Sequence, residues 1–171
     1  MPPRTTNPGK PGFVRQPLLR GERVSFDGRF HNVRDAVLLP APDRPIPILI
    51  AAKAPRMLRL TARYADAWNT AWYGIPNERL HQRLADLDAA LTAEHRDPAS
   101  IRRTVGVEVI DCAAANADGP PDTAIASSVD ALVEAISAYE ALAFDDLIVG
   151  LRPPTRRLLD QLATALQQRT R

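Results

Sequence analysis

From Ile46 onward the chain repeats one arrangement, in which a short apolar run precedes a longer segment with apolar residues on one helical face. The apolar runs cover residues 46–52, 67–71, 104–113 and 146–151. Each run predicts a strand buried on both faces, as in a parallel sheet. Strand and helix alternate four times, so we predict an α/β fold with a parallel sheet. A doubly wound sheet and a (β/α) barrel both fit this order.

The segments between the runs carry clear helix signals. The first helix is predicted to begin at Pro55, because the missing N–H of proline costs nothing at a first helical position. Spacing of three and four residues gives each helix one apolar face. For the first helix that face is Met57, Leu60, Thr61 and Tyr64, and for the second it is Leu80, Leu84, Leu87 and Leu91.

The N-terminal part of the chain has a different composition. Residues 1–16 combine prolines and glycines with polar residues, and we predict a disordered arm there. The segment RVSFDGRFHNV that follows predicts a β-hairpin with a two-residue loop at Asp27-Gly28. The remaining chain, 17–171, is predicted to be one domain.

Composition excludes several classes of protein. The net charge is only +2, which gives no electrostatic basis for binding nucleic acid. No apolar stretch approaches the roughly 20 residues that span a membrane, and the first residues do not resemble a signal peptide, so we expect a cytoplasmic protein. Cys112 is the single cysteine and the three histidines are scattered. We therefore expect no disulfide and no metal site.

Positive charge surrounds the start of the first predicted helix. Lys53, Arg56 and Arg59 flank it, although the macrodipole favours anions at that end. A strand, a short loop and a helix start with flanking cations together form a cradle for phosphate. The alternative is that the three side chains extend into solvent. Neither glycine-rich nucleotide fingerprint is present.

The stretch DAWNTAW places two tryptophans in the second predicted strand. In an extended chain Trp68, Thr70 and Trp72 share one face and Asn69 lies on the other. At the mouth of a parallel sheet these side chains can line a pocket for a planar ligand. Core packing of the tryptophans is the alternative.

The segment PILIAAKAPRMLRLTARYADAWN resembles the pattern P-I-hydrophobic-I-G-G-x-G-P-R-M-L-R-L-A-A-R-Y-A-D-G-W-N of luciferase-like flavin-dependent oxidoreductases. LLRGERVSFDGRFHNVRDAVLLPAP resembles the segment that precedes this pattern, and FDDLIVGLRPPTRRLLDQLATAL is similar to the family's last strand and helix. The resemblance covers about residues 17–168. Alanines, Ala51, Ala52 and Ala54, stand at the three glycine positions of the G-G-x-G part of this pattern.

This resemblance implies a TIM-type (β/α) barrel enzyme that uses reduced FMN or the deazaflavin coenzyme F420. The activity implied is monooxygenation, or hydride transfer involving a small organic substrate. The cofactor phosphate is expected at Ala51, Ala52, Lys53, Ala54 and Arg56, and a substrate pocket at Trp68, Asn69 and Trp72. No residue stands out as a catalytic acid or base.

A complete barrel of this type needs about 250 residues, and the four predicted units correspond to its C-terminal half. We therefore expect a truncated family member that keeps part of the phosphate site and has no independent activity. Two alternatives stay open. One is a non-catalytic half-barrel that self-associates, as a homo-oligomer, or pairs with a partner. The other is a small phosphate-binding α/β module of different ancestry.

Overall fold

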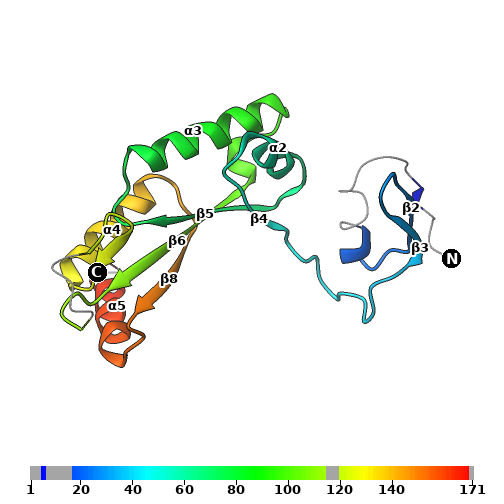
Figure 1. Ribbon diagram of the computed structural model, residues 1–171. Coiled ribbons are helices and arrows are strands. Elements are labelled where there is room, and N and C mark those ends of the chain that lie inside the picture. Colours follow the sequence, from blue (N-terminus) through cyan, green and yellow to red (C-terminus); the bar gives the residue numbers. More distant parts are fainter. Residues whose placement is uncertain (1–4, 7–16, 115–119, 170–171) are drawn as a thin grey trace. The chain divides into compact units, whose positions relative to one another are not determined.

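The computed structural model describes residues 5–6, 17–114 and 120–169 (Figure 1). The chain divides into two compact units, Met1–Ile48 and Leu49–Arg171. The arm predicted for residues 1–16 lies outside the described residues, apart from Thr5–Thr6, which form strand β1.

The first unit contains a β-hairpin, as predicted. Strand β2, Val24–Asp27, pairs antiparallel with β3, Asn32–Ala36, and β1 lies parallel to β2. The predicted loop length of two residues was wrong, because Asp27 pairs with Asn32 and four residues separate them. The Gly28 N–H donates both to the His31 carbonyl and to the Asn32 Oδ1 atom. A Cβ at Gly28 would lie 2.9 Å from the His31 oxygen, so this turn requires glycine for close approach.

The second unit confirms the predicted alternation of strands and helices. The first strand is shorter than predicted, and one three-residue strand, β7, was not predicted. In chain order the elements are β4 (Leu49–Ala51), α2 (Pro55–Tyr64), β5 (Ala67–Tyr73), α3 (Glu78–Ala93), the 3-10 helix η1 (Pro98–Ser100), β6 (Arg102–Ile110), β7 (Ala124–Ala126), α4 (Val129–Ala141), β8 (Asp146–Arg152) and α5 (Arg156–Arg169).

The strands form one parallel sheet in which β4, β5, β6 and β8 lie side by side in that order (Figure 1). Strand β7 pairs with the last residues of β6, beyond the point where β5 ends. Strands β4 and β8 are therefore the two edges of the sheet. Because all strands run the same way, their carboxyl ends meet at one edge, where parallel α/β proteins bind ligands.

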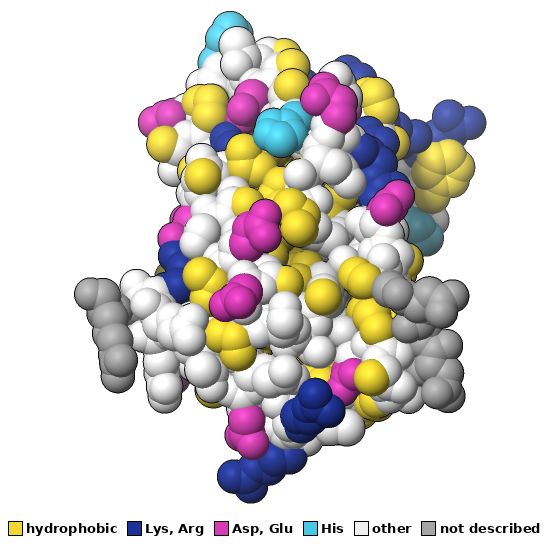
Figure 2. Space-filling view, turned by 90° about the vertical axis from the view of Figure 1, so that its left-hand side faces the viewer, with side chains coloured by type: hydrophobic (Ala, Val, Ile, Leu, Met, Phe, Trp, Pro, Cys, Tyr) yellow, Lys and Arg dark blue, Asp and Glu magenta, His cyan; other side chains and the backbone are white. Residues whose placement is uncertain are grey.

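The two faces of the sheet differ in burial. Helices α2 to α5 lie on one side (Figure 1), and the side chains facing them form the core, including Trp68, Val105 and Val107. The residues between these positions point to the other face, which no helix of the second unit covers; we call it the open face. Over the helix layer, acidic, basic and hydrophobic side chains are interspersed (Figure 2).

The four predicted leucines of α3 are all buried. For α2 the predicted inner face was wrong in part. Leu58, Thr61 and Ala62 are buried there, whereas Met57 and Leu60 are exposed. The inward face of α2 thus combines one leucine with two small residues, and Met57 and Leu60 lie on another face of the helix.

Candidate functional site

The loop after β4 leads directly into α2 at the carboxyl edge of the sheet. Four of the five residues predicted to hold a phosphate, Ala51, Lys53, Ala54 and Arg56, are exposed. Ala52 is buried, its N–H donates to the Asn69 carbonyl, and its own carbonyl accepts from the Trp68 indole at 2.9 Å. The Ala52 peptide therefore anchors the loop to β5 and leaves the next residues accessible.

The alanines of this loop are compatible with its backbone. The loop contains no residue with positive φ, and Ala54 is extended, with φ of −85° and ψ of 147°. Glycine is required where φ is positive or where backbones approach closely. Alanine therefore replaces the glycines of the family pattern without backbone strain.

Helix α2 begins without a side-chain cap. The N-cap residue is Ala54, whose methyl side chain cannot accept a hydrogen bond, and the first turn contains no acidic residue. By contrast, the side chains of Asn77 and Ser128 accept from backbone N–H groups at the starts of α3 and α4. The N–H groups in the first turn of α2, together with the helix dipole, are therefore available to an anion.

Further cations reach this loop from α3. The Lys53 Nζ atom donates to the Ala71 carbonyl at 2.6 Å, toward the carboxyl end of β5. The Arg83 guanidinium donates to the Lys53 carbonyl at 3.1 Å. Arg79 donates to the Trp72 carbonyl at 3.1 Å and lies over the Tyr73 ring. We call Lys53, Arg56, Arg79 and Arg83 the basic cluster.

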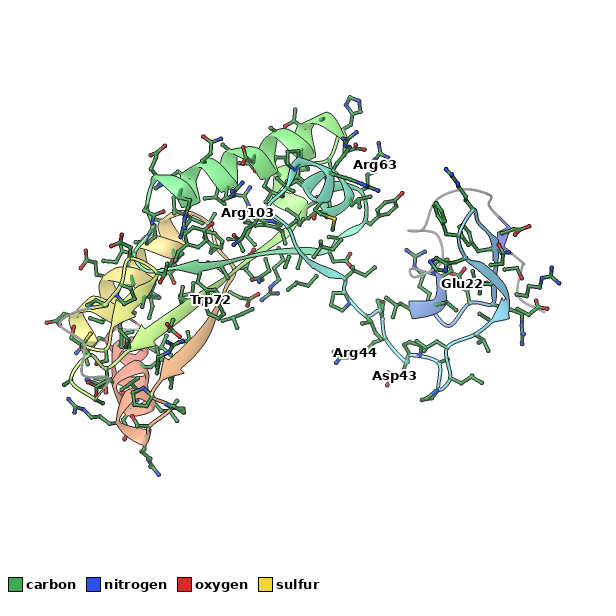
Figure 3. The ribbon with its side chains drawn as sticks, in the orientation of Figure 1. Glu22, Asp43, Arg44, Arg63, Trp72 and Arg103 are labelled. Atoms are coloured by element: carbon green, nitrogen blue, oxygen red, sulfur yellow. The ribbon has the colours of Figure 1, made fainter. Side chains whose placement is uncertain are left out.

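The basic cluster is deficient in acidic partners. Elsewhere in this unit arginines pair with carboxylates, as in Arg63–Glu94 and Arg103–Asp88; the two arginines are labelled in Figure 3. Within the cluster Arg83 pairs with Asp86. No carboxylate of the described residues forms an ion pair with the other three members. The sequence analysis missed Arg79 and Arg83, because only packing of α3 against the loop brings them there.

The predicted substrate-pocket residues separate onto two faces. Trp68 is fully buried in the core on the helix side. A register irregularity between Ala71 and Tyr73 in β5 then reverses the alternation, so Tyr73 is buried and Trp72 is 52% exposed. The structure therefore does not bring the two tryptophans together.

Asn69 and Trp72 both belong to the open face. The Asn69 Oδ1 atom accepts from the Thr104 hydroxyl at 2.8 Å, which leaves its amide N–H₂ group to donate elsewhere. A Cβ added at Gly106 would lie 3.4 Å from the Trp72 ring, and one at Gly150 would lie 3.9 Å from it. The indole, labelled in Figure 3, therefore lies within contact distance of two glycine positions, on β6 and β8.

One ion pair follows on the same face, near the carboxyl ends of β6 and β8. Glu108 and Arg152 interact at 2.6 Å. Neither residue was singled out by the sequence analysis, because the two strands that bring them together are far apart along the chain.

Two further properties limit the chemistry of the site. Across residues 5–6, 17–114 and 120–169, no three histidine, cysteine or acidic side chains come together as a metal ion would require. The helices described here also lack the length and apolar content needed to cross a membrane.

Parallel strands, a helix layer and an anion-suited loop at the carboxyl edge define a protein of the (β/α)-barrel type. Residues 14–118 match the family model described as luciferase-like monooxygenase. The chain therefore belongs to the luciferase-like monooxygenase family. It is 35% identical over 89 residues to the F420-dependent hydroxymycolic acid dehydrogenase of Mycobacterium tuberculosis. The aligned residues make up 52% of this chain and 24% of that protein.

Solved structures give the same fold. The coenzyme F420-dependent tetrahydromethanopterin reductase from Methanopyrus kandleri superposes with a TM-score of 0.69 at 14% identity, covering 88% of this chain and 58% of that one. The riboflavin lyase RcaE, solved with modified FMN and riboflavin, gives a TM-score of 0.63 at 11% identity, covering 87% and 49%. The chain thus spans about half the length of these barrels, and its four strand–helix units are half of such a fold.

Proposed function

We propose that this chain is a cofactor-binding half of a luciferase-like oxidoreductase, and that its basic cluster holds the phosphate of F420 or FMN. The observation that carries the proposal is an uncapped helix start beside Lys53, Arg56 and Arg79, which have no carboxylate partner among the described residues. An anion placed there interacts with N–H groups, the helix dipole and the cluster together.

Each member of the cluster has a distinct part in this proposal. Lys53 lies in the loop itself, and its ammonium group moves from the Ala71 carbonyl to a bound phosphate. Arg56, in the first turn of α2, offers the forked pair of donors that suits phosphate oxygens. Arg83 holds the Lys53 peptide in place through its hydrogen bond. Ala51 and Ala54 keep the approach to the N–H groups unobstructed.

The open face next to the cluster suits the ring system of the cofactor. Trp72 offers an apolar surface that is half exposed, and the Asn69 amide can donate to a ring carbonyl. A bound F420 or FMN supplies hydride or oxygen chemistry, and the chain supplies binding and orientation. A small organic substrate would then bind against the same face.

F420 is the better supported cofactor, since the dehydrogenase and the reductase named above are both F420-dependent. FMN stays the alternative because the riboflavin lyase structure contains a modified FMN. The two share a phosphate group, and the basic cluster recognises that group. We also propose that the working form is a homo-oligomer, since the open face needs a covering partner.

Calorimetric titration of the purified chain with F420, FMN and riboflavin tests this function. We expect saturable binding of one or both phosphate-bearing compounds and much weaker binding of riboflavin, which lacks the phosphate. Folded protein that gives no binding heat with any of the three, or binds riboflavin as well as FMN, would contradict the proposal.

The double variant Lys53→Ala with Arg56→Ala identifies the site. Its binding of the phosphate-bearing cofactor should be lost. A matched control is Arg59→Ala with Arg63→Ala, which removes two cations from the later turns of α2. The control should bind as the unchanged chain does. Equal losses in both double variants would point to general attraction by positive charge rather than to a cradle.

A further inference from the structure

The open face exposes large apolar side chains at three places. Leu49 on β4 is 48% exposed, Trp72 on β5 is 52% exposed, and Ile148 on β8 is 50% exposed. By contrast, the two central helices of the layer, α3 and α4, contain no exposed large hydrophobic residue. Exposed apolar residues also lie on α2 and α5, whereas these three lie on a sheet face that the described helices leave uncovered. Exposed apolar surface on such a face is typical of a contact surface.

We propose that the open face binds a second copy of this chain, so that two half-barrels related by a twofold axis form one eight-stranded barrel. Each copy supplies four parallel strands, β4, β5, β6 and β8. The solved barrels are about twice as long as the chain, since it covers 58% and 49% of them. Two copies therefore supply the number of strands that a closed barrel contains.

The two sheet edges suit this arrangement. Neither β4 nor β8 pairs with a further described strand on its outer side, and such edges tend to pair with another chain. A twofold axis parallel to the barrel places β4 of each copy beside β8 of the other. All strands are parallel within one copy, so both new junctions are parallel as well, and closure satisfies both edges at once.

The strand register then predicts which residues meet. Leu49 lies opposite Ala67, and Ala67 opposite Arg102, while Asp146 lies opposite Thr104. In this register Leu49 is level with the position two residues before Asp146. A barrel of this type has a shear of about eight residues, so each identical half contributes about four.

A shift of about four residues toward the carboxyl end of β8 brings Leu49 beside Ile148 of the partner copy. The opposite shift would take Leu49 beyond the start of β8, where no strand is available to pair. Leu49 and Ile148 are the exposed large apolar residues on the two edge strands. The register therefore joins apolar to apolar at both junctions. It places Trp72 at the carboxyl-end mouth of the barrel, beside Arg79 of the basic cluster, where the cofactor ring of the proposed function would bind.

The charges of the open face do not oppose self-association. Arg102 pairs with Asp146, and Glu108 pairs with Arg152, both between neighbouring strands of the same copy. A second copy therefore meets a face whose charges are already neutralised in pairs. Met57 and Leu60 add apolar surface on α2, the helix that follows edge strand β4.

Cysteine cross-linking tests this arrangement directly. In a Cys112→Ser background, one chain carries Leu49→Cys and another carries Ile148→Cys. Within one copy the two positions are about 14 Å apart along the sheet, because three strand spacings separate β4 from β8. A disulfide needs Cα atoms within about 7 Å, so any bond must join two copies. Mixing the two chains under oxidation should give a covalent dimer, and neither chain alone should.

The matched control replaces Ile148→Cys by Leu159→Cys, which is exposed on α5 rather than on the open face. That mixture should give no cross-linked dimer. Ultracentrifugation of the unchanged chain should show a dimer, and Ile148→Arg should shift it to monomer while Leu159→Arg should not. Circular dichroism confirms that each variant folds.

A chain that stays monomeric at all concentrations would overturn the proposal. So would a dimer in which the Leu159 mixture cross-links as well as the Ile148 mixture. A monomer that associates only with a separately expressed N-terminal half of a luciferase-like relative would assign the open face to that partner instead of to a second copy.

Discussion

The Trp68 indole nitrogen donates a hydrogen bond to the carbonyl oxygen of Ala52, 2.9 Å away inside the core. Trp68 belongs to β5 and Ala52 to the loop that leads into α2. The hydrogen bond therefore fixes the loop residue next to Lys53 to a central strand of the sheet. Trp68 therefore supports, from within the core, the loop that we propose to hold phosphate.

Replacing Trp68→Phe removes this donor and leaves the buried Ala52 carbonyl unpaired. Together with the lost volume, we expect the free energy of unfolding to fall by about 2–4 kcal/mol. Urea unfolding measures the change. Trp72→Phe is the matched control, because that indole is half exposed, and its effect should stay within about 0.5 kcal/mol. Similar losses in both variants would show that the core bond contributes nothing.

Arg83 provides a separate test of the cluster. Arg83→Met removes one cation and the hydrogen bond to the Lys53 carbonyl, while keeping much of the apolar stem. We expect the affinity for FMN or F420 to fall about tenfold, equivalent to about 1.4 kcal/mol. Calorimetry on this variant and on Gln82→Met, at the neighbouring exposed position of α3, measures the difference. An unchanged dissociation constant in Arg83→Met would remove Arg83 from the site.

The two glycines beneath Trp72 give a third prediction. A Cβ at Gly106 would lie 3.0 Å from the Ala71 side chain and 3.4 Å from the indole, whereas at Gly150 the nearest atom is 3.8 Å away. The tight approach is the one to Ala71, so Gly106→Ala should push that residue and the adjoining Trp72 away from β6. We expect this to destabilise the fold by about 1 kcal/mol, as mild overpacking does.

Gly150→Ala should leave the position of Trp72 and the free energy of unfolding nearly unchanged. Tryptophan fluorescence reports the displacement, since Trp68 is buried and only Trp72 meets solvent. Urea unfolding of both variants reports the stability. Identical spectra for Gly106→Ala and the unchanged chain would mean that the indole does not rest on these glycines.

Much of the fold was predictable because local patterns and tertiary packing agree. The leucine stripe of α3 has helical spacing, and all four leucines are buried. Pro55 begins α2, and Asp97 caps the 3-10 turn that starts at Pro98. In these segments burial, propensity and capping all favour the same structure.

The predictions that were wrong or incomplete concern features set by contacts between residues far apart in the sequence. Helix α2 has apolar residues on more than one side, and only packing decided that Leu58 rather than Met57 faces the sheet. A one-residue irregularity in β5 moved Trp72 to the open face, which no period-two pattern reveals. Arg79 and Arg83 join Lys53 only because α3 packs beside α2.

The ion pair at the amino ends of β6 and β8 gives a pH prediction. Hydrogen bonds from Arg102 hold the pKa of the Asp146 carboxyl below its usual range. A lowered pKa in the folded chain means that this pair stabilises the fold above the ordinary aspartate pKa. The stabilisation is then lost as the pH falls through the lowered value.

Asp146→Asn should therefore reduce the free energy of unfolding at pH 6 by up to about 1 kcal/mol, because both partners are partly exposed. The difference from the unchanged chain should shrink as the pH falls toward 3, and should also shrink in high salt. Asp160→Asn is the control, since Asp160 pairs with Arg156 at 3.8 Å and both side chains are highly exposed. Urea unfolding between pH 6 and pH 3 measures these differences, and a gap between Asp146→Asn and the unchanged chain that widens toward acid would contradict the assigned pKa direction.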